Sequence, residues 1–111
     1  MIQAIELAQF YGTEGYTRGH MNVLMTDGVN YLTQYGASWL VTDATVIVKQ
    51  KLAQHEFVMI EALVDENNTA RVIYSDGNDN ILHKQIYEYT DLSCNVKMYY
   101  TNNVMMLAGE Y

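Results

Sequence analysis

The sequence predicts a single α+β domain in which N-terminal helices pack on one face of a four- to five-stranded antiparallel meander. Helix-forming patterns are confined to the first half of the chain, whereas β-rich runs separated by polar turns fill the second half. The length of 111 residues suffices for one hydrophobic core and is too short for two. We therefore expect one domain over residues 1–111, with residues 1–53 mainly helical around an irregular loop at 12–20, and an antiparallel sheet over 56–107.

Three segments of the first half are expected to be helices. Residues Gln3 to Tyr11 repeat apolar side chains at helical spacing, and Gly12 follows where a helix typically ends. The Thr-Asp-Gly run at 26–28 has the residue types of a turn or a helix N-cap, so Val29 to Tyr35 would form the next helix. Ser38 to Leu52 mixes strand-favouring residues with an apolar helical stripe, and its length favours a helix.

The segment between the first two of these helices is expected to be mostly irregular. Gly12 to Gly19 contains three glycines in eight residues, which is typical of an ordered loop with unusual backbone conformations. Asn22 to Met25 is short and apolar, and we expect it to form one edge strand.

Five β-rich runs are expected to form the sheet. Their connectors are rich in Asp, Asn and Gly, which tolerate turn and left-handed geometry. In the first run, alternate residues from Val58 to Val64 form one apolar face, yet Phe57, Met59 and Leu63 make the other face nearly as apolar. We expect that second face to be covered either by a dimer partner or by the N-terminal helices. The runs are Phe57–Val64, Ala70–Ser75, Ile81–Tyr89, Val96–Thr101 and Val104–Leu107.

Composition points to a protein that binds another macromolecule. Thirteen acidic residues against six basic ones give a formal charge of −7, which disfavours direct binding to nucleic acid or to anionic membranes and favours a basic partner. Ten tyrosines either supply a half-exposed contact surface or simply replace phenylalanine in strands. The single cysteine, Cys94, cannot form an internal disulfide, and no signal peptide or membrane span is evident, so we expect a cytoplasmic protein with Cys94 as a small buried hydrophobe.

The chemistry-bearing residues lack the spacing that metal binding or catalysis requires. No two of the three histidines lie three or four residues apart, as ligands on one helix face would. Residues 76–80 resemble the start of a calcium loop, but Ile81 stands where that loop needs Gly and Tyr87 where it needs Glu, so a hairpin turn is expected. Neither Cys94 nor any serine lies in a nucleophile motif, and no phosphate-binding glycine motif occurs. We expect no cofactor, no metal, no catalytic residue and no enzymatic activity.

Carboxylates are the candidate binding residues. Eight of them lie between Glu56 and Asp91, where the only basic residues are Arg71 and Lys84. The turns at 65–68 and 76–80 would lie at opposite ends of one strand and form two negative tips. These carboxylates either imitate phosphates toward a nucleic-acid-binding protein or are solvated turn residues that confer solubility. The candidate partner-binding residues are Glu14, Asp27, Asp65, Glu66, Asp76, Asp79, Glu88 and Asp91.

Six short strings spread over nearly the whole chain form a recognisable pattern. In the first half they are Phe10-x-Gly12-Thr13-Glu14-x-Tyr16, Thr26-Asp27-Gly28-x-x-Tyr31-Leu32 and Gly36-x-x-Trp39-Leu40-x-x-Asp43. In the second half they are Asp76-Gly77-Asn78, Tyr89-Thr90-Asp91 and Leu107-x-x-Glu110-Tyr111. With this pattern the chain resembles a family of small uncharacterised proteins carried by bacteriophages and other mobile elements.

The resemblance implies a biological setting rather than site residues, because that family has no established activity. The strings themselves mark either a functional surface or the turns that set the fold. Small acidic proteins of mobile elements often disable host defences, so the resemblance implies an anti-CRISPR or anti-restriction inhibitor in the cytoplasm of a bacterial host. Its partner would be a host protein or nucleoprotein complex with a basic surface. The alternative is a structural or scaffolding homodimer without inhibitory activity.

Overall fold

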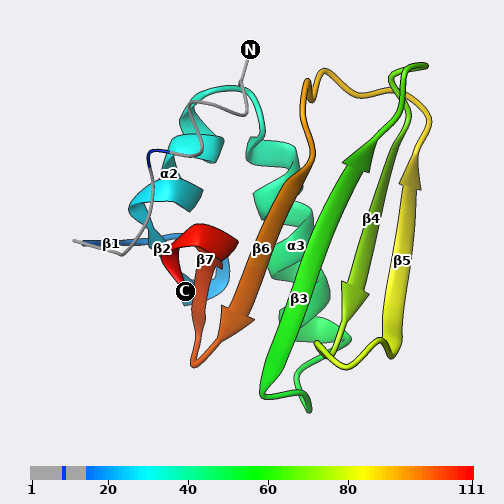
Figure 1. Ribbon diagram of the computed structural model, residues 1–111. Helices are drawn as coiled ribbons and strands as arrows, with labels where there is room; N and C mark the ends of the chain where they lie inside the picture. The colour runs from blue at the N-terminus through cyan, green and yellow to red at the C-terminus, as the bar shows by residue number, and fades with distance from the viewer. Residues whose placement is uncertain (1–8, 10–14) are drawn as a thin grey trace.

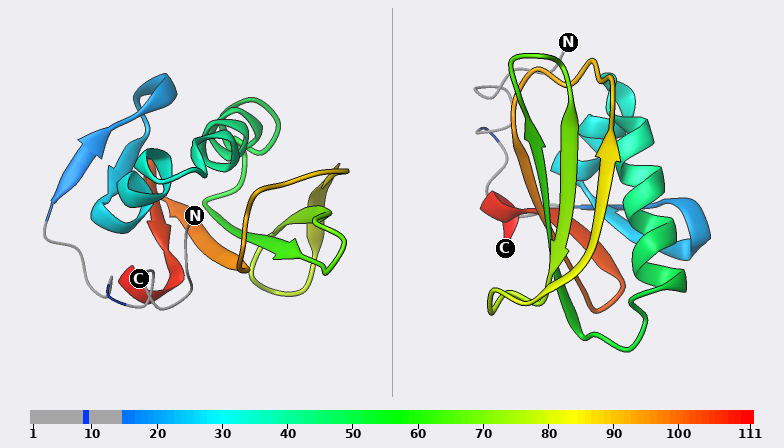
Figure 2. Two further views of the ribbon diagram at one scale, coloured as in Figure 1. Left: turned by 90° about the horizontal axis from the view of Figure 1, so that it is seen from above. Right: turned by 90° about the vertical axis from the view of Figure 1, so that its right-hand side faces the viewer.

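The computed structural model describes Gln9 and residues 15–111 of the chain, in which two α-helices lie on one face of a mixed seven-stranded sheet (Figure 1). The helix expected over Gln3–Tyr11 falls, apart from Gln9, outside the described residues. Seen from above, both helices lie on the same side of the sheet (Figure 2). The predicted α+β class and the single helical layer are thus present in the described part of the chain.

The elements follow one another in the order β1, β2, α2, α3 and then β3 to β7, with a short 3₁₀ turn at His20–Asn22 and another at Ala108–Glu110. The sheet order is β1-β2-β7-β6-β3-β4-β5. The bounds of the strands and helices are β1 Tyr16–Arg18, β2 Leu24–Thr26, α2 Asp27–Gln34, α3 Ser38–Gln50, β3 Phe57–Val64, β4 Ala70–Ser75, β5 Ile81–Tyr87, β6 Val96–Thr101 and β7 Val104–Leu107.

The prediction of a four- to five-stranded antiparallel meander is wrong. Strands β3, β4 and β5 do form a meander, but the chain then returns across the sheet, so that β6 pairs with the other side of β3. Strand β2 pairs with β7 in parallel, which makes the sheet mixed. The error arises because sequential strands pair only as a tendency, and the long, apolar β3 is the strand best suited to the centre of the sheet.

The N-terminal strands also differ from the expectation. An edge strand was predicted over Asn22–Met25, whereas β2 covers Leu24–Thr26 and lies inside the sheet. Met21 and Asn22 have positive φ values of 55° and 63°, which a strand cannot accommodate. The edge is β1, within the stretch predicted to be an irregular loop. At Gly19 a Cβ would lie 2.9 Å from the Met25 sulfur, so glycine permits this close packing.

The two described helices confirm the predictions for residues 29–35 and 38–52. Helix α2 begins at Asp27, where the Thr26 hydroxyl accepts a hydrogen bond from the Val29 amide at 3.4 Å and thereby caps the helix. It ends before Gly36, whose φ of 103° suits glycine. Helix α3 retains β-branched residues because its apolar stripe packs on the sheet.

The hydrophobic core lies between the helices and the face of the sheet that carries the even-numbered residues of β3. Its members on both layers are almost inaccessible to solvent, and each fully buried aliphatic side chain of this kind stabilises the fold by about 1.5–3 kcal/mol. The helical layer contributes Val29, Leu32, Leu40, Ala44 and Val48, and the sheet contributes Val58, Ile60, Ala62, Val72 and Met98.

The opposite face of the sheet, which we call the open face, is not covered by either described helix. Phe57, Met59, Glu61 and Leu63 project there from β3 and are partly exposed. The expected burial of this face under the N-terminal helices therefore does not hold for α2 and α3. A dimer partner on this face stays a prediction.

Candidate functional site

Four of the predicted carboxylates gather at one end of the sheet with an exposed tyrosine. The turn between β3 and β4 meets the connector that follows β5, because the Thr90 amide donates to the Asn68 carbonyl at 2.8 Å and the Thr69 hydroxyl donates to the Glu88 carbonyl at 3.4 Å. Both segments lie at the same end of the sheet (Figure 1). We call the exposed residues at this end the acidic tip: Asp65, Glu66, Glu88, Tyr89 and Asp91.

The first segment of the acidic tip is an ordered turn. The Asp65 carboxylate accepts hydrogen bonds from the amides of Asn67 at 2.9 Å and Thr69 at 3.0 Å. Asn68 adopts a left-handed φ of 61°, as its residue type allows. Because these bonds use one oxygen of Asp65, its second oxygen and the neighbouring Glu66 are left at the surface with their charge.

The second segment presents an aromatic ring beside the carboxylates. Tyr89 is 72% exposed, and its hydroxyl donates to the Asp91 carboxylate at 2.9 Å. This hydrogen bond, and then the negative charge of Asp91, raise the pKa of the Tyr89 hydroxyl. The segment is held from below by Thr90 and Leu92, both buried, with the Leu92 amide donating to the Thr90 hydroxyl.

A shallow hollow of about 160 Å³ lies beside this ring. A tyrosine flanked by carboxylates is suited to an arginine or lysine side chain, which gains from both the negative charge and the ring face. The residues lining the hollow are Asn68, Tyr89, Thr90, Asp91, Leu92 and Ser93.

The remaining predicted site residues lie elsewhere. Asp76 and Asp79 occupy the turn at the opposite end of β4, so the prediction of two separate negative ends is confirmed. Asp76 accepts hydrogen bonds from the Asn80 side chain at 2.8 Å and from the Asn78 amide at 2.8 Å, and these bonds lower its pKa. Asp27 is exposed at the start of α2, and Glu14 lies outside the described residues.

The open face is not acidic. Glu61 lies opposite Lys97 on one side and Ile73 on the other, and Lys84 follows across β5. Arg71 also projects from this face, as the partner of Leu63. The negative charge of the second half therefore lies mainly at the ends of the sheet, where the sequence predicted two negative tips.

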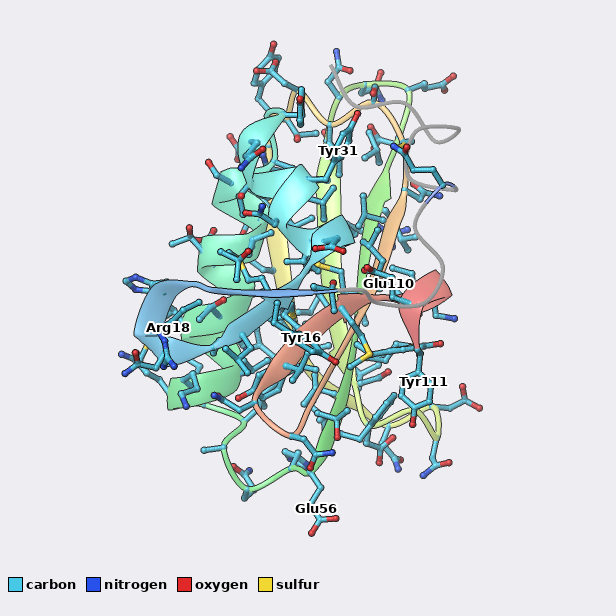
Figure 3. All side chains as sticks on the ribbon, turned by 90° about the vertical axis from the view of Figure 1, so that its left-hand side faces the viewer. Tyr16, Arg18, Tyr31, Glu56, Glu110 and Tyr111 are labelled. Atoms are coloured by element: carbon cyan, nitrogen blue, oxygen red, sulfur yellow. The ribbon has the colours of Figure 1, made fainter. Side chains whose placement is uncertain are left out.

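An aromatic cluster occupies one part of the open face. The rings of Phe57, Tyr99 and Tyr111 lie within 5.0–5.8 Å of one another, centroid to centroid. Tyr111 is 71% exposed, and Figure 3 shows it at the rim of the molecule. Tyr111 and Tyr89 fit the interpretation of tyrosine as a contact residue, whereas Tyr74 is fully buried and fits the interpretation of tyrosine as a strand residue.

The strings at 26–32 and 107–111 meet around one buried carboxylate. Glu110 accepts hydrogen bonds from the Thr26 hydroxyl at 2.6 Å, the Gly28 amide at 3.1 Å and the Leu107 amide at 3.0 Å. A Cβ on Gly28 would lie 2.5 Å from both Glu110 and Leu107, so only glycine fits there. Glu110 is buried, and Figure 3 shows it at the C-terminal 3₁₀ turn. These strings therefore have a structural role.

The string at 36–43 also has a structural contact. The Tyr87 hydroxyl donates to the Asp43 carboxylate at 2.6 Å, and the Tyr87 ring packs against Trp39 with centroids 4.8 Å apart. Burial, and then the hydrogen bond to Asp43, raise the pKa of Tyr87. This contact ties α3 to the edge strand β5.

A hollow of about 560 Å³ lies where the end of α3 meets the β6–β7 turn. Two of its donors are already engaged, since Lys49 and Tyr100 both donate to the Asn103 side-chain oxygen, at 3.3 and 3.2 Å. Within the described part of the chain, no three His, Cys, Asp or Glu side chains are grouped to hold a metal ion. The hollow is therefore a feature of the turn rather than a recognisable site.

The fold and the acidic tip define a small α+β protein with a charged, aromatic-bearing end. The chain belongs to a family of unknown function, DUF6876, whose model matches residues 1–111. No match was found among curated proteins or among solved structures. None of the helices in the described residues is long and apolar enough to cross a membrane.

Proposed function

We propose that this protein acts by binding a protein with a basic surface, and that the acidic tip makes the contact. The observation that carries the proposal is that two connectors bring four exposed carboxylates and the exposed Tyr89 to the same end of the sheet. The bound protein would be one that otherwise holds nucleic acid, and the complex would block that surface. The protein is thus a binding inhibitor and not an enzyme.

The clustered carboxylates and the aromatic ring of Tyr89 both suit a basic protein surface. A surface built for nucleic acid presents lysine and arginine to closely spaced phosphates, and clustered carboxylates offer a similar pattern of negative charge. Exposed ion pairs contribute only about 0–1 kcal/mol each, so the charges mainly raise the association rate and select the partner. Tyr89 would supply a larger part of the affinity through contact with an arginine or an apolar side chain.

The setting of the proposal comes from the resemblance to proteins of phages and mobile elements. In that setting the target would be a host nucleic-acid-binding defence complex, and the protein would be an inhibitor of the anti-CRISPR or anti-restriction type in the bacterial cytoplasm. The acidic composition supports a nucleoprotein complex with a basic surface as the partner.

The test compares two matched double variants. Asp65→Asn with Glu66→Gln removes two charges from the acidic tip and leaves the Asp65 turn an amide oxygen to accept its hydrogen bonds. Glu56→Gln with Asp79→Asn removes two exposed charges elsewhere. Each protein is immobilised on a solid support and incubated with a nuclease-treated bacterial lysate, and the captured proteins are identified by mass spectrometry.

The proposal predicts that the wild-type protein and the control variant capture a nucleic-acid-binding protein that the tip variant loses. The isolated target is then titrated with its nucleic acid in the presence of the wild-type protein, which should compete. Equal capture by both variants would exclude the acidic tip as the contact. Undiminished nucleic-acid binding in the complex would exclude inhibition.

A second candidate function, a structural homodimer, is favoured by the partly exposed apolar residues of the open face. Phe57, Met59 and Leu63 would form its interface. Replacing Met59 by Lys should abolish such a dimer in a sedimentation experiment while leaving the acidic tip intact.

A further inference from the structure

Strand β5 is an open sheet edge with a self-complementary charge pattern. It pairs with β4 on one side, and no described element pairs with its other side. It spans seven residues without proline, whereas the opposite edge, β1, spans three. A long unpaired edge presents a row of free backbone donors and acceptors and is a template for another strand.

Several side chains along this edge are exposed, and they include a large apolar residue. Ile86 is 60% exposed and lies opposite Arg71, on the open face of the sheet. Lys84, two residues earlier, projects from the same face. Glu88 follows the strand directly, in a bend, and would take the next alternate position of this face if a partner strand extended β5 by one residue. Within the described residues, no salt bridge joins Lys84 or Glu88 to another side chain.

We propose that β5 pairs in antiparallel fashion with β5 of a second copy of this chain, with the two-fold axis at Ile86. In this register Lys84 of each copy lies opposite Glu88 of the other, and the two Ile86 side chains meet between the two ion pairs. The sheet then continues through both copies, and Glu88 of each acidic tip lies at the contact between them.

Charge selects this register over its neighbours. An axis at Lys84 would bring the two lysines opposite each other, and like charges in directly opposed positions are destabilising. An axis at Gln85 would place Lys84 opposite Ile86, and neither charge would then find a partner. Only the axis at Ile86 pairs both charges and buries the exposed isoleucine.

The contact is small, so the dimer should be weak. Five residues of each copy pair, which is less than the roughly 1,200 Å² of buried surface expected of a stable interface. We therefore expect association only at high protein concentration, with a dissociation constant on the order of 100 µM. This inference shares Glu88 with the acidic tip, and the tip variant Asp65→Asn with Glu66→Gln separates the two, because it leaves both Lys84 and Glu88 in place.

Charge reversal tests the register directly. In the single variants Lys84→Glu and Glu88→Lys, each copy presents like charges to the other, and dimerisation should weaken at least about tenfold. In the double variant the charges are exchanged but still opposed, so dimerisation should return. A mixture of the two single variants should form a heterodimer, because Glu at position 84 of one then faces Lys at position 88 of the other.

Sedimentation velocity over a concentration series measures all of these species, and circular dichroism verifies that each variant folds. A monomeric wild-type protein throughout the series would overturn the proposal and leave Lys84 as a protective edge charge. Single variants that dimerise like the wild type would also overturn it, as would two monomeric single variants that fail to associate when mixed. Disruption by Met59→Lys alone would place any dimer on the open face instead.

Discussion

The buried carboxylate of Glu110 and the exposed carboxylates of the acidic tip show two uses of the same chemical group. Glu110 accepts three hydrogen bonds and joins the C-terminal 3₁₀ turn to the start of α2, so both of its oxygens serve to hold the fold together. Asp65 and Glu66 sit at the surface, and only one oxygen of Asp65 serves the turn. Location in the fold, rather than residue type, therefore separates a structural carboxylate from one that can meet a partner.

Glu110→Ala should have the largest effect on stability. It leaves the amides of Gly28 and Leu107 and the Thr26 hydroxyl without their acceptor in a buried position. We expect a loss of about 3 kcal/mol in the free energy of unfolding, measured by urea denaturation. Glu110→Gln should cost less, because one oxygen remains as an acceptor. A loss below about 0.5 kcal/mol for Glu110→Ala would contradict the comparison.

Gly28→Ala should have the next largest effect. The added Cβ would lie 2.5 Å from Glu110 and from Leu107, so the carboxylate or the strand end must shift. We expect a loss of about 2 kcal/mol in the free energy of unfolding. The exposed Gly36 is the comparison position: its hypothetical Cβ has no atom within 4 Å, so Gly36→Ala would be opposed only by the positive φ of this residue. Combining Gly28→Ala with Glu110→Ala should give less than the sum of the single losses, because both act on one contact.

Tyr87→Phe should cost about 1 kcal/mol, because it removes the hydrogen bond to Asp43 while keeping the ring against Trp39. Tyr74→Phe is its control. The Tyr74 hydroxyl is buried and finds no hydrogen-bond partner in the described part of the chain, so its removal should be neutral or slightly stabilising. A greater loss at Tyr74 than at Tyr87, in thermal or urea unfolding, would contradict the prediction.

Tyr87 also makes the stability of the fold vary with pH in the alkaline range. Burial and the bond to Asp43 raise its pKa in the folded protein above the value of about 10 in an unfolded chain. Above pH 10 the unfolded state loses this proton first, so the folded state loses its advantage as the pH rises toward the folded pKa. Melting temperatures between pH 9 and pH 11 should fall, and they should fall less steeply in Tyr87→Phe.

The smallest effect on stability is expected at the acidic tip. Asp65→Asn with Glu66→Gln should change the free energy of unfolding by less than about 0.5 kcal/mol, because both side chains are exposed and the amide of Asn can replace the turn acceptor. The same variant should lose the partner, so binding and stability would separate. A large loss of stability would remove the distinction between this tip and Glu110.

The local elements of the fold were predictable because their signals are local. The bounds of β3, β4, β6 and β7 agree with the sequence expectation, since alternating apolar residues and Asn or Asp turns define each strand within a few positions. Asn68, Asp79, Asn102 and Asn103 indeed adopt positive φ values in those turns. The strand predicted over residues 81–89 extends two residues beyond β5, because Tyr89 is a strand-favouring residue and nothing in it indicates that the chain leaves the sheet at Glu88.

Strand order and the site could be predicted only in part, because both depend on contacts between distant segments. Nothing near Leu24 indicates its pairing with Val104. The carboxylates Asp65, Glu66, Glu88 and Asp91 were predicted from the sequence as candidate binding residues. Their meeting at one end of the sheet was not predicted, because it depends on hydrogen bonds between distant segments, from Thr90 to Asn68 and from Thr69 to Glu88. The Tyr-Thr-Asp string at 89–91 was the one local signal that marked this connector.

The contact between Thr26 and Glu110 also bears on how the chain reaches its native state. The two residues are 84 positions apart, and β2 obtains its inner neighbour β7 from the same late segment. Closing so long a loop is slow relative to forming the β3–β4–β5 hairpins, because its entropy cost precedes any reward from the contact. During synthesis the central meander can therefore form early, whereas the end of the sheet that contains α2 and β2 is completed only after residues 104–110 have emerged.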